Sequence, residues 1–174
     1  MSDLLVKLMY REASNRMADS SILAQSVNTR GDSAYLLNLL ALEILLKCAL
    51  LINEEKLVRG HKYSELFEML PKDQRDRIVS VAAERLGPTV NYSDLDSKLN
   101  VFSSNFIKLR YPYESYKDLT EEEYFQLGDQ WMERGAIVEE AEFKYYPEEL
   151  YGLQYALSKE VEAWLANQSP EIDA

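Results

Sequence analysis

Apolar residues recur along this chain every three or four positions, in stretches separated by short polar breaks. This spacing predicts α-helices, because residues three or four apart lie on one helix face. It predicts long helices over 3–27, 32–53, 71–86, 93–111 and from Pro147 through Trp164, and short ones opening at Gly60 and Thr120. Residues 134–146 have no clear helical period, which predicts a loop or a short hairpin.

The helix predicted over 32–53 is apolar almost all round, as expected of a helix at the centre of a bundle. Asn38, Glu43 and Lys47 interrupt its apolar run, which argues for a core helix and against a membrane span. The start of the chain has no cleavable apolar segment, so we expect a soluble, cytoplasmic protein. The pattern predicts one all-α domain over 1–174, folded as an up-and-down helical bundle with extra short helices.

Single residues refine this prediction. Pro112 has no N–H and is expected to bend or end the fifth helix. Thr120 and Glu123 have the spacing of a capping box that opens the next helix. Cys48, the one cysteine, lies in an apolar run and is predicted to be a buried small hydrophobe.

The charge of the chain is unevenly distributed. Residues 1–117 carry 16 Lys/Arg and 15 Asp/Glu, whereas residues 118–149 alone carry 11 acids and 2 bases. Such an acidic segment repels phosphate backbones, so nucleic-acid binding by the whole surface is disfavoured. The acidic segment is either a solvated face or a surface that meets a basic partner, and the nearly neutral first part could still present a local basic patch.

Several kinds of chemistry are disfavoured by the residues present. His61 is the only histidine and Cys48 the only cysteine, so a usual zinc site or a Glu-x-x-His di-iron site cannot form. The chain has no nucleophile elbow around a serine and no glycine loop that would cradle a phosphate. We therefore expect no metal and no cofactor.

Three segments in order resemble one known family. An acid and a lysine four apart lie in the apolar run Ala41-Leu42-Glu43-Ile44-Leu45-Leu46-Lys47-Cys48-Ala49-Leu50. The segment Gly60-His61-Lys62-Tyr63-Ser64-Glu65-Leu66 follows, and then Asn105-Phe106-Ile107-Lys108-Leu109-Arg110-Tyr111-Pro112-Tyr113-Glu114. This set, which covers about residues 35–115, resembles the HEPN domain family, in the branch with an Arg-Tyr-x-Tyr-Glu signature.

The resemblance implies a helical bundle that forms a homodimer and belongs to a toxin–antitoxin or defence setting. Many members of the family are metal-independent RNases in which an Arg and a His four to six residues later act on the substrate. Their Arg can hold a phosphate through two hydrogen bonds, and their His can move a proton near neutral pH. Arg110 matches the motif Arg, but no His occurs among residues 111–117.

Several residues are candidates for a site around Arg110, and each has two interpretations. Arg110 either contacts a phosphate or forms an internal ion pair with Glu114 or Glu43. His61 either approaches Arg110 as an acid/base or bonds to the backbone at a helix start. Glu43 and Lys47 either line a polar pocket or form a structural network with Arg110. Tyr111, Tyr113 and Tyr116 either stack on bases or pack at a subunit interface. In some toxin-type members of the family a Tyr accepts a nucleotidyl group. That Tyr follows the motif His, which this chain lacks after Arg110.

The sequence supports three hypotheses about function. The first is a dimeric HEPN-like binding or regulatory module without standard RNase activity, which holds RNA, a nucleotide or a partner protein near Arg110, Tyr111 and Glu114. The second is a metal-independent RNA endonuclease whose displaced acid/base is His61 or Tyr113. The third is a structural or immunity-type subunit that uses the acidic 118–149 region to mask a basic surface of a partner.

Overall fold

A computed structural model describes residues 3–25, 31–54, 57–88 and 90–168, and in these ranges the chain is helical and has no strand. The long helices are α1 (Asp3–Ala24), α2 (Gly31–Glu54), α4 (Lys72–Leu86), α5 (Leu95–Lys108), α6 (Glu121–Glu133) and α7 (Pro147–Gln168). The short ones are α3 (Tyr63–Glu68) and the 3-10 helices η1 (Pro112–Ser115) and η2 (Val138–Glu140). The prediction of an all-α bundle is confirmed.

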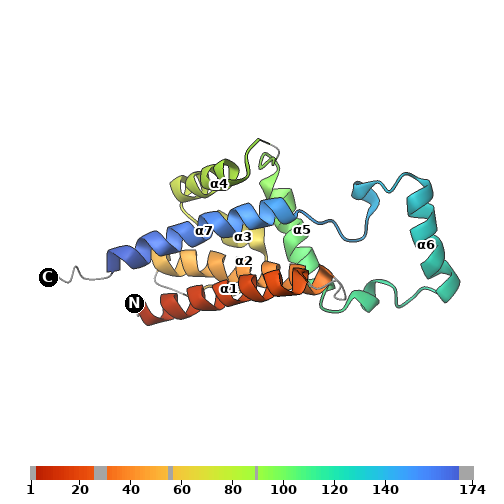
Figure 1. Ribbon diagram of the computed structural model, residues 1–174, viewed down its shortest axis with the longest axis horizontal. Helices are drawn as coiled ribbons and strands as arrows, with labels where there is room; N and C mark the ends of the chain where they lie inside the picture. Colours follow the sequence, from red (N-terminus) through yellow and green to blue (C-terminus); the bar gives the residue numbers. More distant parts are fainter. Residues whose placement is uncertain (1–2, 26–30, 55–56, 89, 169–174) are drawn as a thin grey trace.

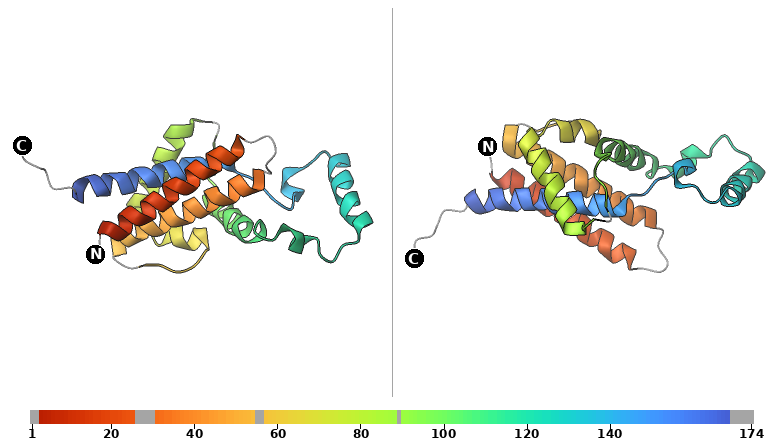
Figure 2. Two further views of the ribbon diagram at one scale, coloured as in Figure 1. Left: turned by 60° about the horizontal axis from the view of Figure 1, so that its bottom comes forward. Right: turned by 90° about the horizontal axis from the view of Figure 1, so that it is seen from above.

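The apolar helix α2 lies at the centre of the bundle (Figure 1). Helix α1 runs antiparallel to it along one side, and α7 packs against it on another side in the same direction as α2. Helix α4 covers α7, while α3 and α5 close the remaining side of α2 (Figure 2). This arrangement gives α2 a neighbour on nearly every side, as its all-round apolar pattern predicted.

The core is built from aliphatic and aromatic side chains of all these bundle helices. Its largest wholly buried side chains include Leu39, Leu42, Leu45, Leu50, Tyr63, Phe102 and Ile78. Full burial of one such side chain stabilises the fold by about 1.5–3 kcal/mol relative to exposure. Hydrogen bonds between helices supplement this packing. Ser20 Oγ donates to the Ala34 carbonyl at 2.8 Å, and Gln154 Nε2 donates to the Asn38 carbonyl at 2.8 Å.

Helix α2 passes a length and composition test for a membrane span, the one helix of the described ranges that does, but 61% of the tested window is buried inside the bundle. Burial of that kind is common in the core helix of a soluble protein. Cys48 on this helix is free and buried, as predicted. Burial raises the pKa of its thiol to about 12.

Helices α4 and α7 approach closely at Gly152. A Cβ atom at this position would lie 2.1 Å from the Tyr92 hydroxyl and 2.8 Å from Leu86 Cδ1. A Cβ atom added at Gly128 on α6, by contrast, would have no neighbouring atom within 4 Å. The absence of a side chain at 152 therefore permits the observed packing of α7 against α4 and the residues that follow it.

Most predicted boundaries agree with the structure within a few residues. Helix α3 begins at Tyr63, not at Gly60, because Gly60 has φ 116° and so lies outside helical backbone space. Helix α5 ends at Lys108 and Pro112 opens η1, while both halves of the capping box at Thr120 and Glu123 are present. Residues 134–146 form a loop with the single turn η2 and no hairpin, and the predicted end of the first helix near residue 27 falls outside the described residues.

Residues 112–146, from η1 to the start of α7, form an arm that projects from the bundle, with α6 at its far end (Figures 1 and 2). No residue of α6 is buried, and α6 takes no part in the extensive helix–helix contacts of the bundle. The base of the arm is tied to α5, because Asn105 Nδ2 donates to the Lys144 carbonyl at 2.7 Å and Lys108 Nζ lies 2.7 Å from Glu142 Oε1.

Candidate functional site

The candidate site lies where the last turn of α5 meets the loop before α3. Arg110 follows the end of α5, and its backbone N–H donates to the Ile107 carbonyl at 3.3 Å, which continues the last helical turn. Its guanidinium carbon lies 3.9 Å from the centroid of the Phe106 ring. This position over an aromatic face is a cation–π contact, which leaves the N–H donors of the guanidinium available at their edges.

Arg110 is exposed, and the described residues place no carboxylate within ion-pair distance of its guanidinium. An internal ion pair with Glu43 or Glu114 is therefore not formed. Glu114 is exposed on η1 and is held through its backbone N–H, which donates to the Tyr111 carbonyl at 2.9 Å. Of the two interpretations of Arg110, the geometry fits a guanidinium that is open to an external anion.

Glu43 is the buried centre of the polar cluster beside Arg110. Lys47 Nζ lies 2.8 Å from Glu43 Oε1, and His61 Nδ1 lies 3.0 Å and 2.9 Å from the two carboxylate oxygens. The Glu43 side chain is 6% exposed, whereas that of His61 is 56% exposed. A buried carboxylate is thus compensated by a lysine on its own helix and by the imidazole from the loop.

The contact with Glu43 fixes the orientation of the His61 ring. A carboxylate accepts hydrogen bonds, so Nδ1 is the donor and carries the hydrogen. In the neutral ring, the second nitrogen, Nε2, is then a proton acceptor, and the side chain as a whole is 56% exposed. The predicted alternative, a bond from His61 to the backbone of a helix start, is not what the structure has.

Phe106 joins the two halves of the site. The His61 ring centroid lies 5.8 Å from that of Phe106, and the same ring supports Arg110. The buried hydroxyl of Tyr63 is close enough to the Glu43 carboxylate and the Arg110 guanidinium for both charges to act on it. Burial raises the pKa of Tyr63 most, the charge of Glu43 raises it further, and the charge of Arg110 lowers it. Glu43, His61, Phe106 and Arg110 therefore form one continuous cluster, which we call the Arg110 cluster.

The tyrosines that follow Arg110 lie at the entrance to the arm. Tyr111 and Tyr113 are 54% and 65% exposed, and their rings meet edge to face with centroids 6.2 Å apart. Tyr116 instead packs on Tyr124 of α6 at 5.1 Å between centroids. The first two rings are accessible to a planar ligand beside Arg110, whereas Tyr116 belongs to the arm.

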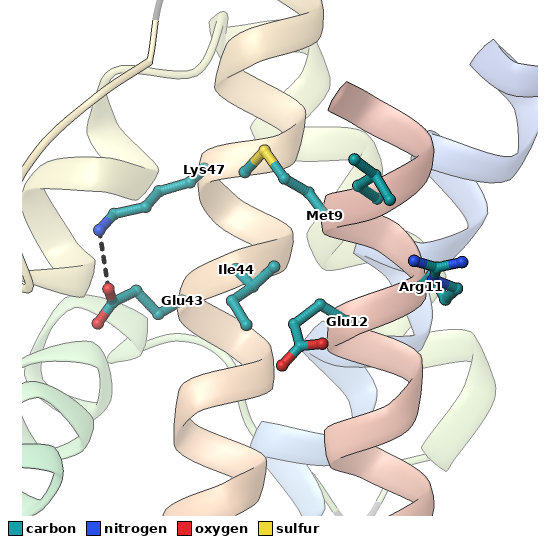
Figure 3. Close-up of a pocket in the computed structure, with 7 residues that line it drawn as sticks. Met9, Arg11, Glu12, Glu43, Ile44 and Lys47 are labelled. Carbon is teal, nitrogen blue, oxygen red and sulfur yellow. Dashed lines mark hydrogen bonds and ion pairs between the residues drawn. The ribbon is translucent and has the colours of Figure 1, made fainter. Parts of the chain in front are cut away.

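A shallow groove of about 440 Å³ runs between α1 and α2 and reaches the same cluster from the other side (Figure 3). Leu8, Met9 and Ile44 form its apolar part, with Glu12 at its side. Glu43 and Lys47 point from α2 away from α1, toward α3 and α5, which explains why they meet His61 (Figure 3).

The structure thus brings together most of the residues that the sequence singled out. Glu43 and Lys47 form the predicted i, i+4 pair, but their third member is His61 and not Arg110. Phe106 and Tyr63 were not predicted as site residues, although both lie in the segments that resemble the HEPN family. The contact between Phe106 and Arg110 could have been predicted from their spacing, because residues four apart lie on the same face of a helix.

Comparisons of the chain with protein-family models, with curated proteins and with solved structures found no match. In the described residues, no group of three or more His, Cys, Asp or Glu side chains is arranged to hold a metal ion.

Proposed function

We propose that this protein is a HEPN-like binding or regulatory module that holds a phosphate group, as part of RNA or a nucleotide, at the Arg110 cluster, without standard RNase activity. The observation that carries the proposal is the state of Arg110. Its guanidinium rests on Phe106 at 3.9 Å and has no carboxylate partner in the described part of the chain, because Glu43 is already bound by Lys47 and His61.

The chemistry of the cluster suits a phosphate. A guanidinium can donate two parallel hydrogen bonds to phosphate oxygens, and these charge-assisted bonds are stronger than neutral ones. The exposed rings of Tyr111 and Tyr113 offer faces on which a base can stack. The acidic region 118–149 works against long nucleic acids, so a short or end-bound ligand fits better than an extended one.

One observation favours a second candidate, a metal-independent RNA endonuclease. His61 and Arg110 contact the same Phe106 ring, and the Glu43 carboxylate orients His61 so that Nε2 is the proton acceptor. Nε2 could accept the proton of a 2′-OH, whose oxygen attacks the phosphorus held by Arg110 and displaces the 5′-oxygen; the protonated ring then returns the proton to that leaving oxygen. In that mechanism His61 is the displaced acid/base that the Arg motif lacks. Tyr113, the other candidate, is exposed and would have to donate through its phenol.

A single titration with a cleavage control tests the proposal. A short 5′-labelled RNA is titrated with the protein in EDTA, and its intactness is followed in the same samples. We expect binding without cleavage, competition by a nucleoside monophosphate, and at least about tenfold weaker binding by Arg110→Ala, since a hydrogen bond to a charged group contributes about 1.5–3 kcal/mol. Equal binding by the wild type and Arg110→Ala would overturn the proposal.

Arg85→Ala is the matched control, because it removes one positive charge from an exposed side chain on α4, where Arg85 contacts Tyr151 and not the Arg110 cluster. It is expected to bind RNA like the wild type. Cleavage that is lost in both Arg110→Ala and His61→Gln would establish the endonuclease instead. Cleavage that survives His61→Gln but is lost in Tyr113→Phe would move the acid/base to Tyr113.

A further inference from the structure

The arm exposes an unusual share of apolar surface. Seven of the sixteen exposed large apolar side chains of the described residues lie between residues 119 and 145, namely Leu119, Tyr124, Phe125, Leu127, Met132, Ile137 and Tyr145. Phe125 and Met132 on α6 are 63% and 65% exposed and lie seven residues apart, which places them on one side of the helix. Exposed apolar surface gathered in this way marks interaction sites.

Helix α6 also lacks the packing that normally stabilises a helix of its length. It has 13 residues, and isolated helices of about 12–15 residues are marginal in water. The capping box at Thr120 supports its first turn, but none of its residues is buried against the bundle. A helix with one apolar side and no tertiary partner is completed when another surface covers that side.

An open hollow of about 520 Å³ lies inside the arm, between α6 and the segment that returns to the bundle. Leu119, Leu127, Trp131 and Phe143 give it apolar walls. Trp131 is fixed there, because its Nε1 donates to the Ile137 carbonyl at 2.8 Å. The hollow is therefore a preformed place for apolar side chains of a partner.

The charge of the arm determines the partner's chemistry. Two acids near the hollow are compensated, since Glu140 pairs with Arg134 and Glu142 with Lys108. The acids of α6 have no such partner in the described ranges: Glu121, Glu122, Glu123, Asp129 and Glu133 make no ion pair with any Lys or Arg. An apolar surface flanked by uncompensated carboxylates is complementary to a surface that is apolar and basic, and it repels nucleic acids and anionic lipids.

We propose that the arm, residues 112–146, is a docking site for a basic amphipathic helix of a partner protein. The apolar face of that helix covers α6 from Phe125 and Met132 to the edge of the hollow at Trp131. Its Lys or Arg side chains meet Asp129 and Glu133, which border the side of α6 that carries Phe125 and Met132. This is the helix-in-groove mode of recognition, in which apolar residues three, four and seven apart give affinity and the flanking charges give specificity. It is independent of the phosphate site at Arg110.

The test uses the full chain carrying Trp164→Phe, so that Trp131 is its only tryptophan and reports on the hollow. The probe is a synthetic 18-residue peptide of Leu and Lys with helical periodicity. Two matched peptides accompany it, one with Glu in place of Lys and one with the same Leu and Lys residues in an order without helical period. We expect a change of Trp131 fluorescence with the first peptide only, and binding that weakens as salt is raised.

Paired variants locate the contact. Asp129→Asn with Glu133→Gln is expected to weaken peptide binding about three- to tenfold. Phe125→Ser with Met132→Ser, on the apolar side next to those acids, is expected to weaken it about tenfold or more. The control pair Glu68→Gln with Glu84→Gln removes the same two charges from exposed positions outside the arm and is expected to bind like its parent. The arm variants should keep the melting temperature of the parent because α6 has no buried residue, and the control pair should keep it because Glu68 and Glu84 are exposed.

Four results would overturn the proposal. They are no binding of the periodic Leu/Lys peptide, equal binding of the aperiodic one, equal weakening by the arm pair and the control pair, and sedimentation of the free chain as an oligomer that Phe125→Ser dissociates. The last result would assign the arm surface to a second copy of this chain. Arg110→Ala is expected to bind the peptide normally, so failure here and failure of the phosphate site are distinguishable.

Discussion

Nδ1 of His61 lies 2.9 Å from a carboxylate oxygen of Glu43, and this contact joins the loop before α3 to the middle of the central helix. Glu43 is buried and also bonds Lys47, so one carboxylate organises two cationic or polar groups. The contact holds the loop so that the His61 ring packs against the buried ring of Phe106. The carboxylate is the structural basis of the Arg110 cluster.

Glu43→Gln should destabilise the fold. The amide keeps the shape of the carboxylate but removes its charge, which leaves the ammonium of Lys47, with 18% of its side chain exposed, without compensation. Breaking a fully buried pair costs about 3–5 kcal/mol, and we expect about 2 kcal/mol here because Lys47 and His61 reach solvent. Urea unfolding measures the loss. Glu65→Gln, which breaks the exposed pair with Lys62, should leave the free energy of unfolding almost unchanged, and equal losses in the two variants would contradict the assignment.

Phe106→Leu should weaken binding at the proposed phosphate site while Arg110 stays in place. The substitution keeps an apolar side chain in the core but removes the ring face under the guanidinium, a contact of about 0.5–1 kcal/mol, so a two- to fivefold loss of affinity is expected. Calorimetric titration with a short RNA measures it. Phe102→Leu, one turn earlier on α5 and buried, is the control that shares the loss of stability. Affinity lost equally in both variants would point to general unfolding of α5 instead.

Cys48 should be inert in the folded protein, and the fold should weaken at alkaline pH. Burial raises the pKa of its thiol to about 12, so at pH 8 roughly one molecule in ten thousand carries the reactive thiolate. A thiol reagent is expected to label the chain only after denaturation. Rapid labelling of native protein, with the helical circular dichroism unchanged, would refute the burial of Cys48.

The raised pKa of Cys48 also determines how the free energy of unfolding depends on pH. Above pH 9 the thiol loses its proton in the unfolded chain but keeps it in the folded one, so the free energy of unfolding falls as pH rises toward 12. Tyr10 and Tyr92, whose pKa values are raised to about 12 mainly by burial, act in the same direction above pH 10. Urea titrations between pH 7 and 11 should follow this fall, and Cys48→Ala should make it shallower by up to about 1.4 kcal/mol per pH unit.

Gly152→Ala should destabilise the packing of α7. The new Cβ would overlap the Tyr92 hydroxyl and Leu86, and overpacking of this kind costs about 1–3 kcal/mol. Ala gains up to about 1 kcal/mol over Gly in a helix, so a net loss is expected. Thermal melting measures it. Gly128→Ala, placed in open space on α6, should leave the melting of the bundle unchanged, and a stabilised Gly152→Ala protein would show that Tyr92 moves aside freely.

The helices could be predicted from the sequence because each one is governed by local rules. The spacing of Leu and Phe residues gave their positions, Pro112 ended the fifth helix region, and Thr120 with Glu123 capped the sixth. The partner of Glu43 could be predicted only where it lay on the same helix, at Lys47. His61 is 18 residues away, and its approach depends on how the loop returns across α2 and α5.

The amphipathic pattern of α6 does not reveal what surrounds this helix. A helix with one apolar side normally packs on the core of its own domain, yet α6 stands apart from the bundle. The sequence cannot distinguish a side that faces the chain's own core from one that faces a partner, because both require the same spacing of apolar residues. The high acidity of 118–149 was the one local sign of a different role.

The tie between Asn105 and Lys144 at the base of the arm has a consequence for how this protein can change over evolutionary time. Chain segments that leave and re-enter a scaffold at adjoining points can lengthen, shorten or be replaced with little effect on the scaffold, since the entropy of closing a loop rises only slowly with its length. Bundle and arm are therefore free to diversify at different rates. A lineage could keep the bundle and its Arg110 cluster unchanged while the arm is lengthened, shortened or exchanged.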